Sequence, residues 1–255
     1  MFLMLLIFNL IFGMAIADLC TTVEKQFNIL EELGNGSFGT VYKVEKDGSE
    51  YALKISKQGS GDSLRAEYET ISEIQPDSST IKSFGKPFCI KNGDVTELGL
   101  LLELCTPVEQ LLESIRYRFS SEVPKMVVHL LRSLKSIHKK NFQHFDPYLR
   151  NYLFCNGIYK VADLGMAIKL EDNEMTGNYQ IGDIERMLAD IFEESEERDY
   201  LSIIERTTQN HITMDVSDAR KFYKDFLKNT QNFNSVWGVN GVYSFLFNHP
   251  YLINV

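Results

Sequence analysis

The sequence lacks the features that mark fibrous, disordered or strongly basic proteins. Its 255 residues include only six prolines and sixteen glycines, too few for a collagen-like chain, and 44% of them are hydrophobic, too many for a disordered one. The formal net charge is -9, so no basic excess exists to hold nucleic acid or an anionic membrane surface. The composition indicates a globular protein, and we expect neither a direct nucleic-acid partner nor a stable membrane span.

Cysteine is scarce as well. The four cysteines are Cys20, Cys89, Cys105 and Cys155, and none of them has the C-x-x-C spacing typical of a zinc site or a redox pair. Their surroundings in the sequence are apolar. Because cysteine is one of the most frequently buried residue types, we predict four buried free thiols.

The N-terminal segment 1–17, MFLMLLIFNLIFGMAIA, contains no charged side chain. It ends in the small-x-small pattern Ala-Ile-Ala, which predicts signal-peptide cleavage before Asp18 and therefore secretion. Against this interpretation, the segment has no Lys or Arg at its start and is short for a spanning helix. Translation from Met14 would instead give a nuclear or cytoplasmic protein, so both localisations stay open.

A glycine-rich turn follows the first of several expected strands. Between residues 27 and 56, strand-like apolar stretches flank Gly34, Gly36 and Gly39, and the Asp-Gly pair at Asp47 predicts a turn between two further strands. A G-x-G-x-x-G array lets backbone N–H groups approach phosphate oxygens without interference from a Cβ atom. A dinucleotide-binding version of this array needs a helix after the glycines, whereas a strand is expected here.

This segment resembles the protein kinase superfamily, whose signature is G-x-G-x-x-G-x-V followed by a V-A-I-K strand. The resemblance implies that Val41 and Ala52 sandwich the adenine of ATP and that Lys54 holds its α- and β-phosphates, with Mg²⁺ as the second cofactor. The cofactor-binding residues that it implies are Leu33, Gly34, Asn35, Gly36, Ser37, Phe38, Gly39, Val41, Ala52, Lys54, Glu103, Cys105 and Leu153.

The kinase family pairs this lysine with a glutamate on the next helix. Residues 62–74 predict such a helix, capped by Asp62 or Ser63, with Leu64, Ile71 and Ile74 as its inward stripe. Glu67 lies on that stripe, whereas Glu69 is about 200° around the helix from it. We therefore predict a Lys54–Glu67 ion pair, with Glu69 as the alternative partner.

Residues 98–107 predict a buried strand that runs into a linker, and they resemble the kinase hinge between the two lobes. The resemblance makes Leu102 the gatekeeper and assigns adenine hydrogen bonds to the backbone of Glu103 and Cys105. Residues 124–140 follow with apolar side chains at helical spacing and predict an amphipathic helix that begins at Pro124.

The segment from His144 to Gly165 resembles the H-R-D-L-x-x-x-x-N loop and the D-F-G motif of kinases. The resemblance makes Asp146 the residue that accepts or orients the substrate hydroxyl proton, and Asn151 and Asp163 the Mg²⁺ ligands. Tyr148 occupies the place of the usual loop lysine, and Arg150 can supply that charge. Phe145 replaces the arginine that receives an activation-loop phosphate, so we do not expect switching by loop phosphorylation.

The largest departure from the family lies between Asp163 and Asp183, where only nineteen residues intervene and no A-P-E sequence occurs. Residues 183–192 predict a buried helix whose Asp183 resembles the family aspartate that braces the catalytic loop. The Tyr179-Gln180 pair before it is similar to haspin-like kinases, which would imply a mitotic kinase of a histone tail. Further on, residues 218–227 and 234–247 predict helices, with Trp237 as an anchor of their core.

We therefore predict an α+β, bilobal protein-kinase-like fold within residues 26–255, with a small β-rich N-lobe (26–104), a mainly helical C-lobe (106–255) and Mg-ATP in the cleft between them. The predicted activity is γ-phosphoryl transfer to Ser or Thr of a protein substrate, by a monomer. Two alternatives stay open. The chain could be a pseudokinase that binds ATP as a scaffold, or an atypical kinase of small molecules.

Overall fold

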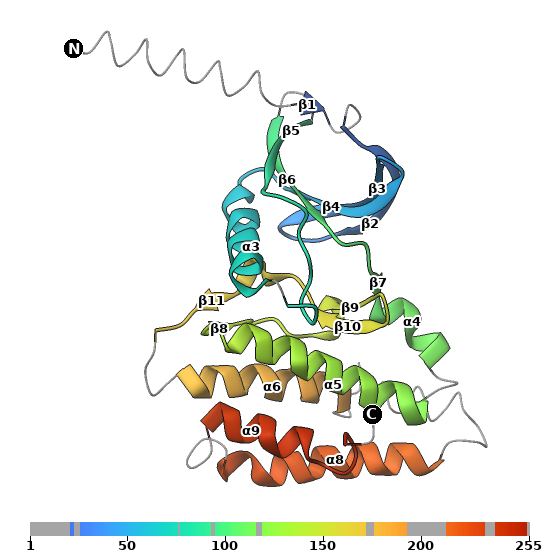
Figure 1. The fold of residues 1–255 in the computed structure, drawn as a ribbon, viewed down its shortest axis with the longest axis vertical. Helices are drawn as coiled ribbons and strands as arrows, with labels where there is room; N and C mark the ends of the chain where they lie inside the picture. The colour runs from blue at the N-terminus through green and yellow to red at the C-terminus, as the bar shows by residue number, and fades with distance from the viewer. Residues whose placement is uncertain are drawn as a thin grey trace. The chain divides into compact units, whose positions relative to one another are not determined.

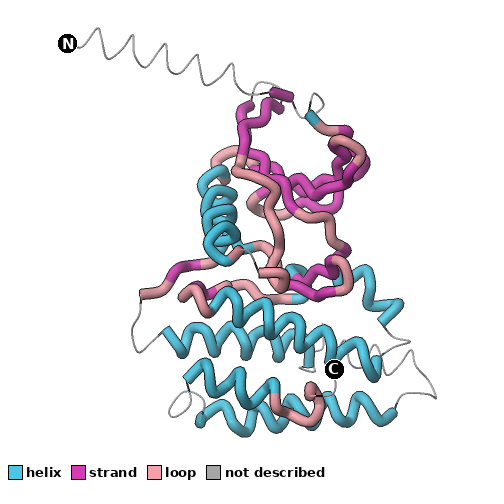
Figure 2. Tube along the Cα trace, in the orientation of Figure 1, coloured by secondary structure: helices cyan, strands magenta, loops and turns pink. Residues whose placement is uncertain are grey.

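The computed structural model describes residues 21–22, 26–75, 77–92, 95–115, 119–171, 176–192, 213–232 and 238–253. These residues form two compact units. The first contains the described residues up to Ser72 together with Lys82–Leu104, and the second contains Glu73–Ile81 and the residues from Cys105 onward. Strands dominate the first unit and helices the second (Figure 2). The predictions for segment 1–17 and for Trp237 lie outside the described residues.

The first unit is built on one six-stranded sheet with the order β1-β5-β6-β4-β3-β2 (Figure 1). Neighbouring strands are antiparallel except β1 and β5, which are parallel. Its elements are β1 (Thr21–Thr22), β2 (Asn28–Asn35), β3 (Gly39–Lys46), β4 (Ser49–Ser56), α3 (Gly61–Ile74), β5 (Phe88–Asn92) and β6 (Val95–Leu102). The predicted succession of β2, β3 and β4 is thus an antiparallel meander.

Local turn chemistry and a small apolar core explain this sheet. Asp47 (φ 53°) and Gly48 (φ 75°) both adopt the left-handed region, as a two-residue hairpin turn requires. The turn sets the β3–β4 register, in which Lys46 pairs with Ser49. The buried cluster on the sheet consists of Phe27, Val44, Leu53, Ile55, Ile90 and Leu101. Burial of these side chains is the main stabilising contribution in the unit.

The second unit is mainly helical. Helix α6 packs against α5, α8 and α9 (Figure 1). Its elements are β7 (Thr106–Pro107), α4 (Val108–Ile115), α5 (Phe119–His138), β8 (Phe142–Gln143), the 3-10 helix η2 (Leu149–Asn151), β9 (Tyr152–Cys155), β10 (Ile158–Val161), the 3-10 helix η3 (Leu164–Met166), β11 (Ile168–Lys169), α6 (Thr176–Phe192), α8 (Thr213–Asn232) and α9 (Gly238–Phe247). Two short sheets, β10-β9-β7 and β11-β8, accompany the helices.

Helix α5 fixes strand β10 through two side chains. The Tyr159 N–H donates to His129 Nδ1 at 3.3 Å, and the Val161 N–H donates to Ser133 Oγ at 3.1 Å. Four residues advance a helix by about 6 Å and two residues advance a strand by about 6.6 Å, so the two spacings match. This match holds β10 in place just before Asp163.

Several helices begin earlier than the sequence pattern predicts. Helix α5 begins at Phe119, so Pro124 lies inside it rather than at its start. Helix α6 begins at Thr176 rather than Asp183, which places Tyr179 and Gln180 on the helix. Helix α3 begins at Gly61, so Asp62 and Ser63 lie in its first turn and are not caps. Apolar periodicity locates buried turns, but the first, polar turn of a helix leaves no such signal.

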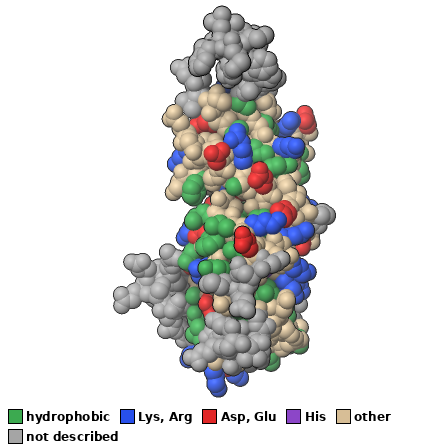
Figure 3. Space-filling view, turned by 90° about the vertical axis from the view of Figure 1, so that its left-hand side faces the viewer, with side chains coloured by type: hydrophobic (Ala, Val, Ile, Leu, Met, Phe, Trp, Pro, Cys, Tyr) green, Lys and Arg blue, Asp and Glu red, His purple; other side chains and the backbone are tan. Residues whose placement is uncertain are grey.

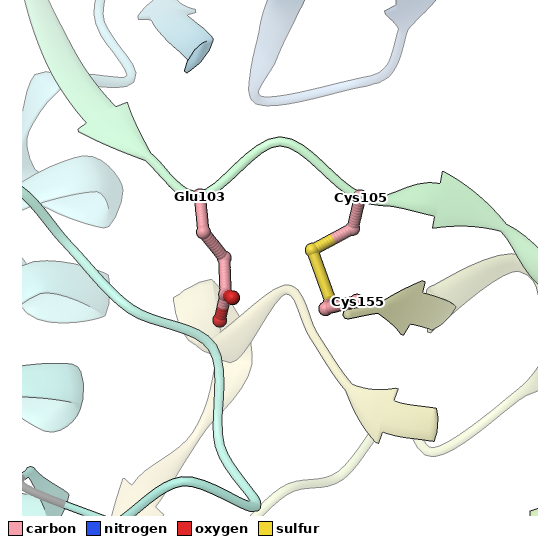
Figure 4. Close-up of side chains that lie close together, drawn as sticks. All are labelled: Glu103, Cys105 and Cys155. Atoms are coloured by element: carbon pink, nitrogen blue, oxygen red, sulfur yellow. A yellow bond between two sulfur atoms is a disulfide. The ribbon is translucent and has the colours of Figure 1, made fainter. Parts of the chain in front are cut away.

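The prediction of free thiols is wrong for the three cysteines that the structure describes, whereas Cys20 lies outside the described residues. Cys105 and Cys155 form a disulfide with a Cα–Cα distance of 4.6 Å (Figure 4), and Cys89 is also disulfide-bonded. The pairing of β7 with β9 explains the first bridge. Thr106 pairs with Phe154 and Pro107 with Leu153, and continuing that register by one residue brings Cys105 opposite Cys155. Strand β7 has two residues, too few to be recognised in the sequence.

Two observations concern the expectation of no nucleic-acid partner and no stable membrane span: the charges on the surface and the lengths of the helices. On the face in Figure 3, basic and acidic side chains of the described residues are interspersed. Within the described ranges, no helix is long and apolar enough to cross a membrane.

Candidate active site

The glycine-rich turn joins β2 to β3 in the first unit. The Gly36 N–H donates to the Gly39 carbonyl oxygen at 2.9 Å, which closes the turn. Asn35, Ser37 and Phe38 are exposed along it. The turn is thus exposed at the surface of the unit between β2 and β3, whose pairing has register shifts between Ile29 and Glu31 and between Glu32 and Gly34. An exposed backbone turn of this kind can present N–H groups to phosphate oxygens.

Glycine is favoured at Gly34, Gly36 and Gly39 for different physical reasons. A Cβ at Gly39 would overlap the carbonyl oxygen of Ile55, so the packing of the chain itself requires glycine there. At Gly34 a Cβ would meet nothing within 4 Å, and at Gly36 its nearest neighbour would be 3.9 Å away. Glycine at these two positions keeps open the space that a phosphate needs when it approaches the backbone, so the turn fits the predicted nucleotide.

Strand register places the predicted nucleotide-binding side chains on one face of the sheet. Val41 pairs with Lys54, and Ala52 pairs with Leu102, the predicted gatekeeper. Because cross-strand partners share a face and residues two apart on a strand share a face, Val41, Ala52, Lys54 and Leu102 lie together. Leu33, also assigned to the cofactor, is half-buried on β2.

Lys54 and Glu67 form an ion pair. The distance from Lys54 Nζ to Glu67 Oε2 is 2.7 Å, and the residues are 9% and 2% exposed. Leu64, Ile71 and Ile74 are buried along the same helix, as the stripe requires. Glu69, the alternative partner, is exposed. Helix α3 therefore turns Glu67 toward β4, which holds the lysine ammonium in place.

The linker residues assigned to adenine are also held in place. The Glu103 N–H donates to the Lys82 carbonyl oxygen at 3.0 Å, and Glu103 Oε1 accepts from the Lys82 N–H at 2.8 Å. These two bonds fix the backbone of Glu103, and its role at the adenine edge stays a prediction. In the second unit, Cys105 is joined to Cys155, and Leu153 pairs with Pro107 on the adjacent strand.

In the second unit, the Asp146 carboxylate is held from two sides. Asn151 Nδ2 donates to Asp146 Oδ2 and to the Asp146 carbonyl oxygen, each at 2.8 Å. Arg150 forms an ion pair with the other carboxylate oxygen, and its guanidinium lies 4.8 Å from the centre of the Tyr148 ring. The aromatic ring that replaces the usual lysine thus supports the arginine that pairs with Asp146.

His144 connects the predicted catalytic loop, residues 144–151, to the segment that carries Asp163. Its Nδ1 accepts from the Asp146 N–H at 3.2 Å, and its Nε2 donates to the Ala162 carbonyl oxygen at 3.0 Å. The Ala162 N–H donates in turn to the Asn151 carbonyl oxygen at 2.8 Å. Burial lowers the pKa of His144, so the imidazole is neutral near pH 7 and can play both roles at once.

These contacts place the two predicted metal ligands on linked backbone. Asn151 uses its Nδ2 for Asp146, so its Oδ1 is the atom that would bind a cation. Asp163, with φ 58°, follows Ala162 directly. A carboxylate and an amide oxygen are hard ligands of the kind that Mg²⁺ prefers, so the donor set fits this ion.

Helix α6 braces the loop through two aspartates, one of which the sequence analysis missed. Asp183 accepts from the His144 N–H at 2.6 Å and the Phe145 N–H at 3.1 Å, as its position predicts. Asp190 accepts from the Leu149 N–H. The two aspartates are seven residues apart and so lie on one face of the helix. This spacing within a buried helix was the signal for Asp190.

Tyr152 is a second missed residue. Its hydroxyl donates to the Pro147 carbonyl oxygen at 2.6 Å, and burial raises its pKa well above the ordinary value. The phenol therefore keeps its proton and stays a donor. No sequence pattern pointed to this bond, because a buried strand tyrosine is most simply a core residue.

The described residues thus provide a glycine turn that fits phosphates, a buried lysine–glutamate pair, and an aspartate bonded to an asparagine whose backbone is linked to the segment of Asp163. These are groups that phosphoryl transfer uses. A family comparison matches the protein kinase domain over residues 27–184, more than half of the chain. The chain belongs to the protein kinase family, and the predicted α+β, bilobal protein-kinase-like fold is confirmed.

Individual relatives are kinases as well. The chain is 35% identical over 159 residues to the membrane-associated tyrosine- and threonine-specific cdc2-inhibitory kinase of Drosophila melanogaster, covering 58% of this chain and 29% of that protein. It is 30% identical over 177 residues to the serine/threonine-protein kinase cst-1 of Caenorhabditis briggsae, covering 67% and 35%. It is 28% identical over 163 residues to the cAMP-dependent protein kinase catalytic subunit of Dictyostelium discoideum, covering 60% and 24%. The matched part thus spans about a third or less of each relative.

Proposed function

We propose that this protein is an ATP-dependent protein kinase that transfers the γ-phosphoryl group to Ser or Thr hydroxyls of a protein substrate. The observation that carries the proposal is the Asp146 carboxylate, held by Asn151 on one oxygen and by Arg150 on the other. A carboxylate held in this way is oriented before a substrate arrives, which is the main contribution a kinase makes.

Each residue has a role in this reaction. Asp146 orients the attacking hydroxyl and accepts its proton. Lys54, held by Glu67, binds the α- and β-phosphates, and Arg150 places positive charge next to Asp146. Asn151 and Asp163 bind Mg²⁺, which neutralises the charge of the phosphates when it is present.

The test is a matched pair of substitutions. Asp146→Asn should lower kcat by at least about a hundredfold, because the general base and the ion pair with Arg150 are both lost. ATP binding should change little. Asp62→Asn removes the same charge from an exposed pair with Arg65 and should leave kcat unchanged. Equal activity of Asp146→Asn and wild type would refute the proposal.

The acceptor is the finer part of the proposal. Serine/threonine specificity is supported by the name of the nematode relative, whereas the fly relative is named as tyrosine- and threonine-specific. Peptides that differ only in carrying Ser, Thr or Tyr, offered with labelled ATP, separate these acceptors. A histone-tail arm tests the substrate that the haspin-like motif predicts, and a small-alcohol arm tests the small-molecule alternative. Binding of Mg-ATP without transfer to any acceptor would favour the scaffold.

We also propose that the protein acts in an oxidising compartment. Every cysteine that the structure describes is disulfide-bonded: Cys89, Cys105 and Cys155. Such bonds persist in the secretory pathway and outside cells, whereas cytosolic and nuclear thiols are kept reduced. This supports secretion over a nuclear role, and it weighs against a histone substrate.

The compartment can be tested with a tagged protein expressed from Met1. Secretion, a mature N-terminus at Asp18 and thiols that resist alkylation until a reductant is added are the expected results. A protein found in the cytosol whose cysteines are alkylated without reduction would refute the oxidising compartment, whatever its activity.

A further inference from the structure

A chain of three buried polar side chains joins the C-terminal helix to the catalytic loop. Tyr243 on α9, His138 at the end of α5 and Asp183 on α6 are 1%, 4% and 0% exposed. The Tyr243 hydroxyl lies 2.8 Å from His138 Nδ1, and His138 Nε2 lies 3.1 Å from Asp183 Oδ2. Tyr243 lies beyond residues 27–184, the segment matched to the kinase family.

The chemistry of the groups sets the direction of this chain. A carboxylate only accepts, so His138 Nε2 carries a proton and donates it to Asp183. In the tautomer that completes this chain, Nδ1 is an acceptor and the Tyr243 hydroxyl donates to it. Burial raises the pKa of Tyr243 well above the ordinary value, so the phenol keeps the proton that it donates.

Asp183 passes this arrangement on to the catalytic loop. Its Oδ2 accepts from His138 and from the His144 N–H, and its Oδ1 accepts from the Phe145 N–H and from Arg186 at 3.3 Å. His144 and Phe145 directly precede Asp146. Any rotation of the Asp183 carboxylate therefore moves the backbone that positions Asp146.

We propose that Tyr243 is a positioning residue for catalysis, which acts through the tautomer and orientation of His138 on Asp183 and so on the loop that carries Asp146. Its contribution to turnover rests on the kinase activity proposed above. Its effect on the loop does not.

The neighbours of Tyr243 allow its hydroxyl to be removed without displacing its ring. Lys135 lies over the Tyr243 ring, 5.4 Å from its centre, and Phe247 stacks on that ring with centroids 6.0 Å apart. The Gln180 side chain donates to the His138 carbonyl oxygen at 2.9 Å. These contacts remain in Tyr243→Phe, so the ring and the helix end should keep their places while Nδ1 loses its donor.

The first experiment compares kcat and KM. Tyr243→Phe should lower kcat by about fivefold, the effect of one buried hydrogen bond, and leave the KM for ATP unchanged. Tyr159→Phe is the matched control, since it removes a hydroxyl bonded to Glu122 at 2.9 Å in the same unit. It should leave kcat within about twofold of wild type. Equal kcat values for both variants would overturn the proposal.

The second experiment is a double-mutant cycle with His138→Gln. If Tyr243 acts through His138, Tyr243→Phe should have no further effect on kcat in the His138→Gln background. A full additional fivefold loss in that background would overturn the route through His138.

The third experiment does not depend on activity. Amide hydrogen exchange at His144 and Phe145, whose N–H groups Asp183 binds, should be faster in Tyr243→Phe than in wild type or Tyr159→Phe. The ¹⁵N resonance of His138 Nδ1 should also shift as its donor is lost. If wild type proves inactive but these changes occur, the proposed function fails and the positioning role stands. Unchanged exchange and an unchanged resonance would overturn the positioning role.

Discussion

The two units hold their functional residues by different means. In the first unit, strand register places Val41, Ala52 and Lys54 on one face, and the buried ion pair with Glu67 adds a side-chain contact. In the second unit, the catalytic loop has little regular structure of its own. Its amides are bonded by side chains from a helix, chiefly Asp183 and Asp190 of α6.

Backbone strain explains why the second unit needs these side chains. Phe145 and Asp163 have φ values of 69° and 58°, in a region that non-glycine residues rarely adopt. Such residues cost of order 1–3 kcal/mol each unless their surroundings hold them. The carboxylates and the neutral imidazole of His144 provide that support. Among the described residues of the first unit, the non-glycine residue with a positive φ is Asp47, in a hairpin turn. We therefore expect the two units to be most sensitive to substitution at different kinds of residue.

The largest effect is expected from Asp183→Ala. It leaves the His144 and Phe145 N–H groups and His138 without their acceptor in a buried site, and should destabilise the second unit by about 4 kcal/mol. Asp190→Ala removes the acceptor of one amide, and about 1–2 kcal/mol is expected. Hydrogen exchange resolved on peptides of each unit measures both changes. Similar losses for the two variants, or losses spread equally over both units, would contradict the comparison.

The next effect concerns the disulfide. Cys155→Ser opens a bridge between residues 50 apart in the sequence, and should destabilise the second unit by about 3 kcal/mol. The double variant Cys105→Ser/Cys155→Ser should match the single one, and a reductant should then change the melting temperature no further through this bridge. A wild type whose melting temperature is insensitive to reductant would show that the bridge contributes nothing.

The Cys105–Cys155 bridge could not be predicted from the sequence, whereas several other features could. The glycine turn and the helix stripe that carries Glu67 are local patterns, and the resemblance to kinases assigned Lys54 and the Asp146–Asn151 segment, so these could be named in advance. The Cys105–Cys155 contact depends on the register of a two-residue strand against a hairpin 50 residues away. Spacing along the chain carries no information about such a pair, and apolar neighbours suggested free thiols instead.

Helices show a related limit. The buried stripe of α3 follows from helical periodicity, and the resemblance to kinases implied the brace at Asp183, so both could be predicted. Tyr243 and His138 could not, because each is most simply a buried core residue in the sequence. Their bond joins residues 105 apart and depends on how α5, α6 and α9 pack. Polar pairs inside a helical bundle depend on how the helices pack, so the sequence does not reveal them. The strand residues of the first unit can be predicted from neighbouring residues in the sequence.

A smaller effect separates two glycines of the first unit. Gly39→Ala introduces a Cβ that overlaps the Ile55 carbonyl oxygen, and should destabilise the first unit by about 2 kcal/mol. Gly36→Ala meets only ordinary contacts, so the free energy of unfolding should stay unchanged while the Kd for ATP rises, because the new methyl group occupies the space of a phosphate. Unfolding in urea and ATP titration measure the two effects. Equal stability losses would contradict the distinction.

The smallest effect is a dependence on pH that is confined to the second unit. All five histidines of the sequence follow residue 104, so none lies in the first unit. Burial lowers the pKa of His144, and that of His129 on α5, below the ordinary value of 6.5. The unfolded chain therefore binds more protons than the folded one below pH 6.5. The stabilisation is present above pH 6.5 and is lost as the pH falls below it.

For one fully buried histidine such as His144, the slope is at most about 1.4 kcal/mol per pH unit. Hydrogen exchange at pH 7.5, 6.5 and 5.5, again resolved by unit, should show faster exchange of second-unit peptides at pH 5.5 after correction for the intrinsic rate. His129→Gln, which keeps an acceptor for the Tyr159 N–H, should weaken this dependence but not remove it, since His144 remains. If the first unit lost as much stability between pH 7.5 and pH 5.5, the dependence would not come from these imidazoles, because that unit has no histidine.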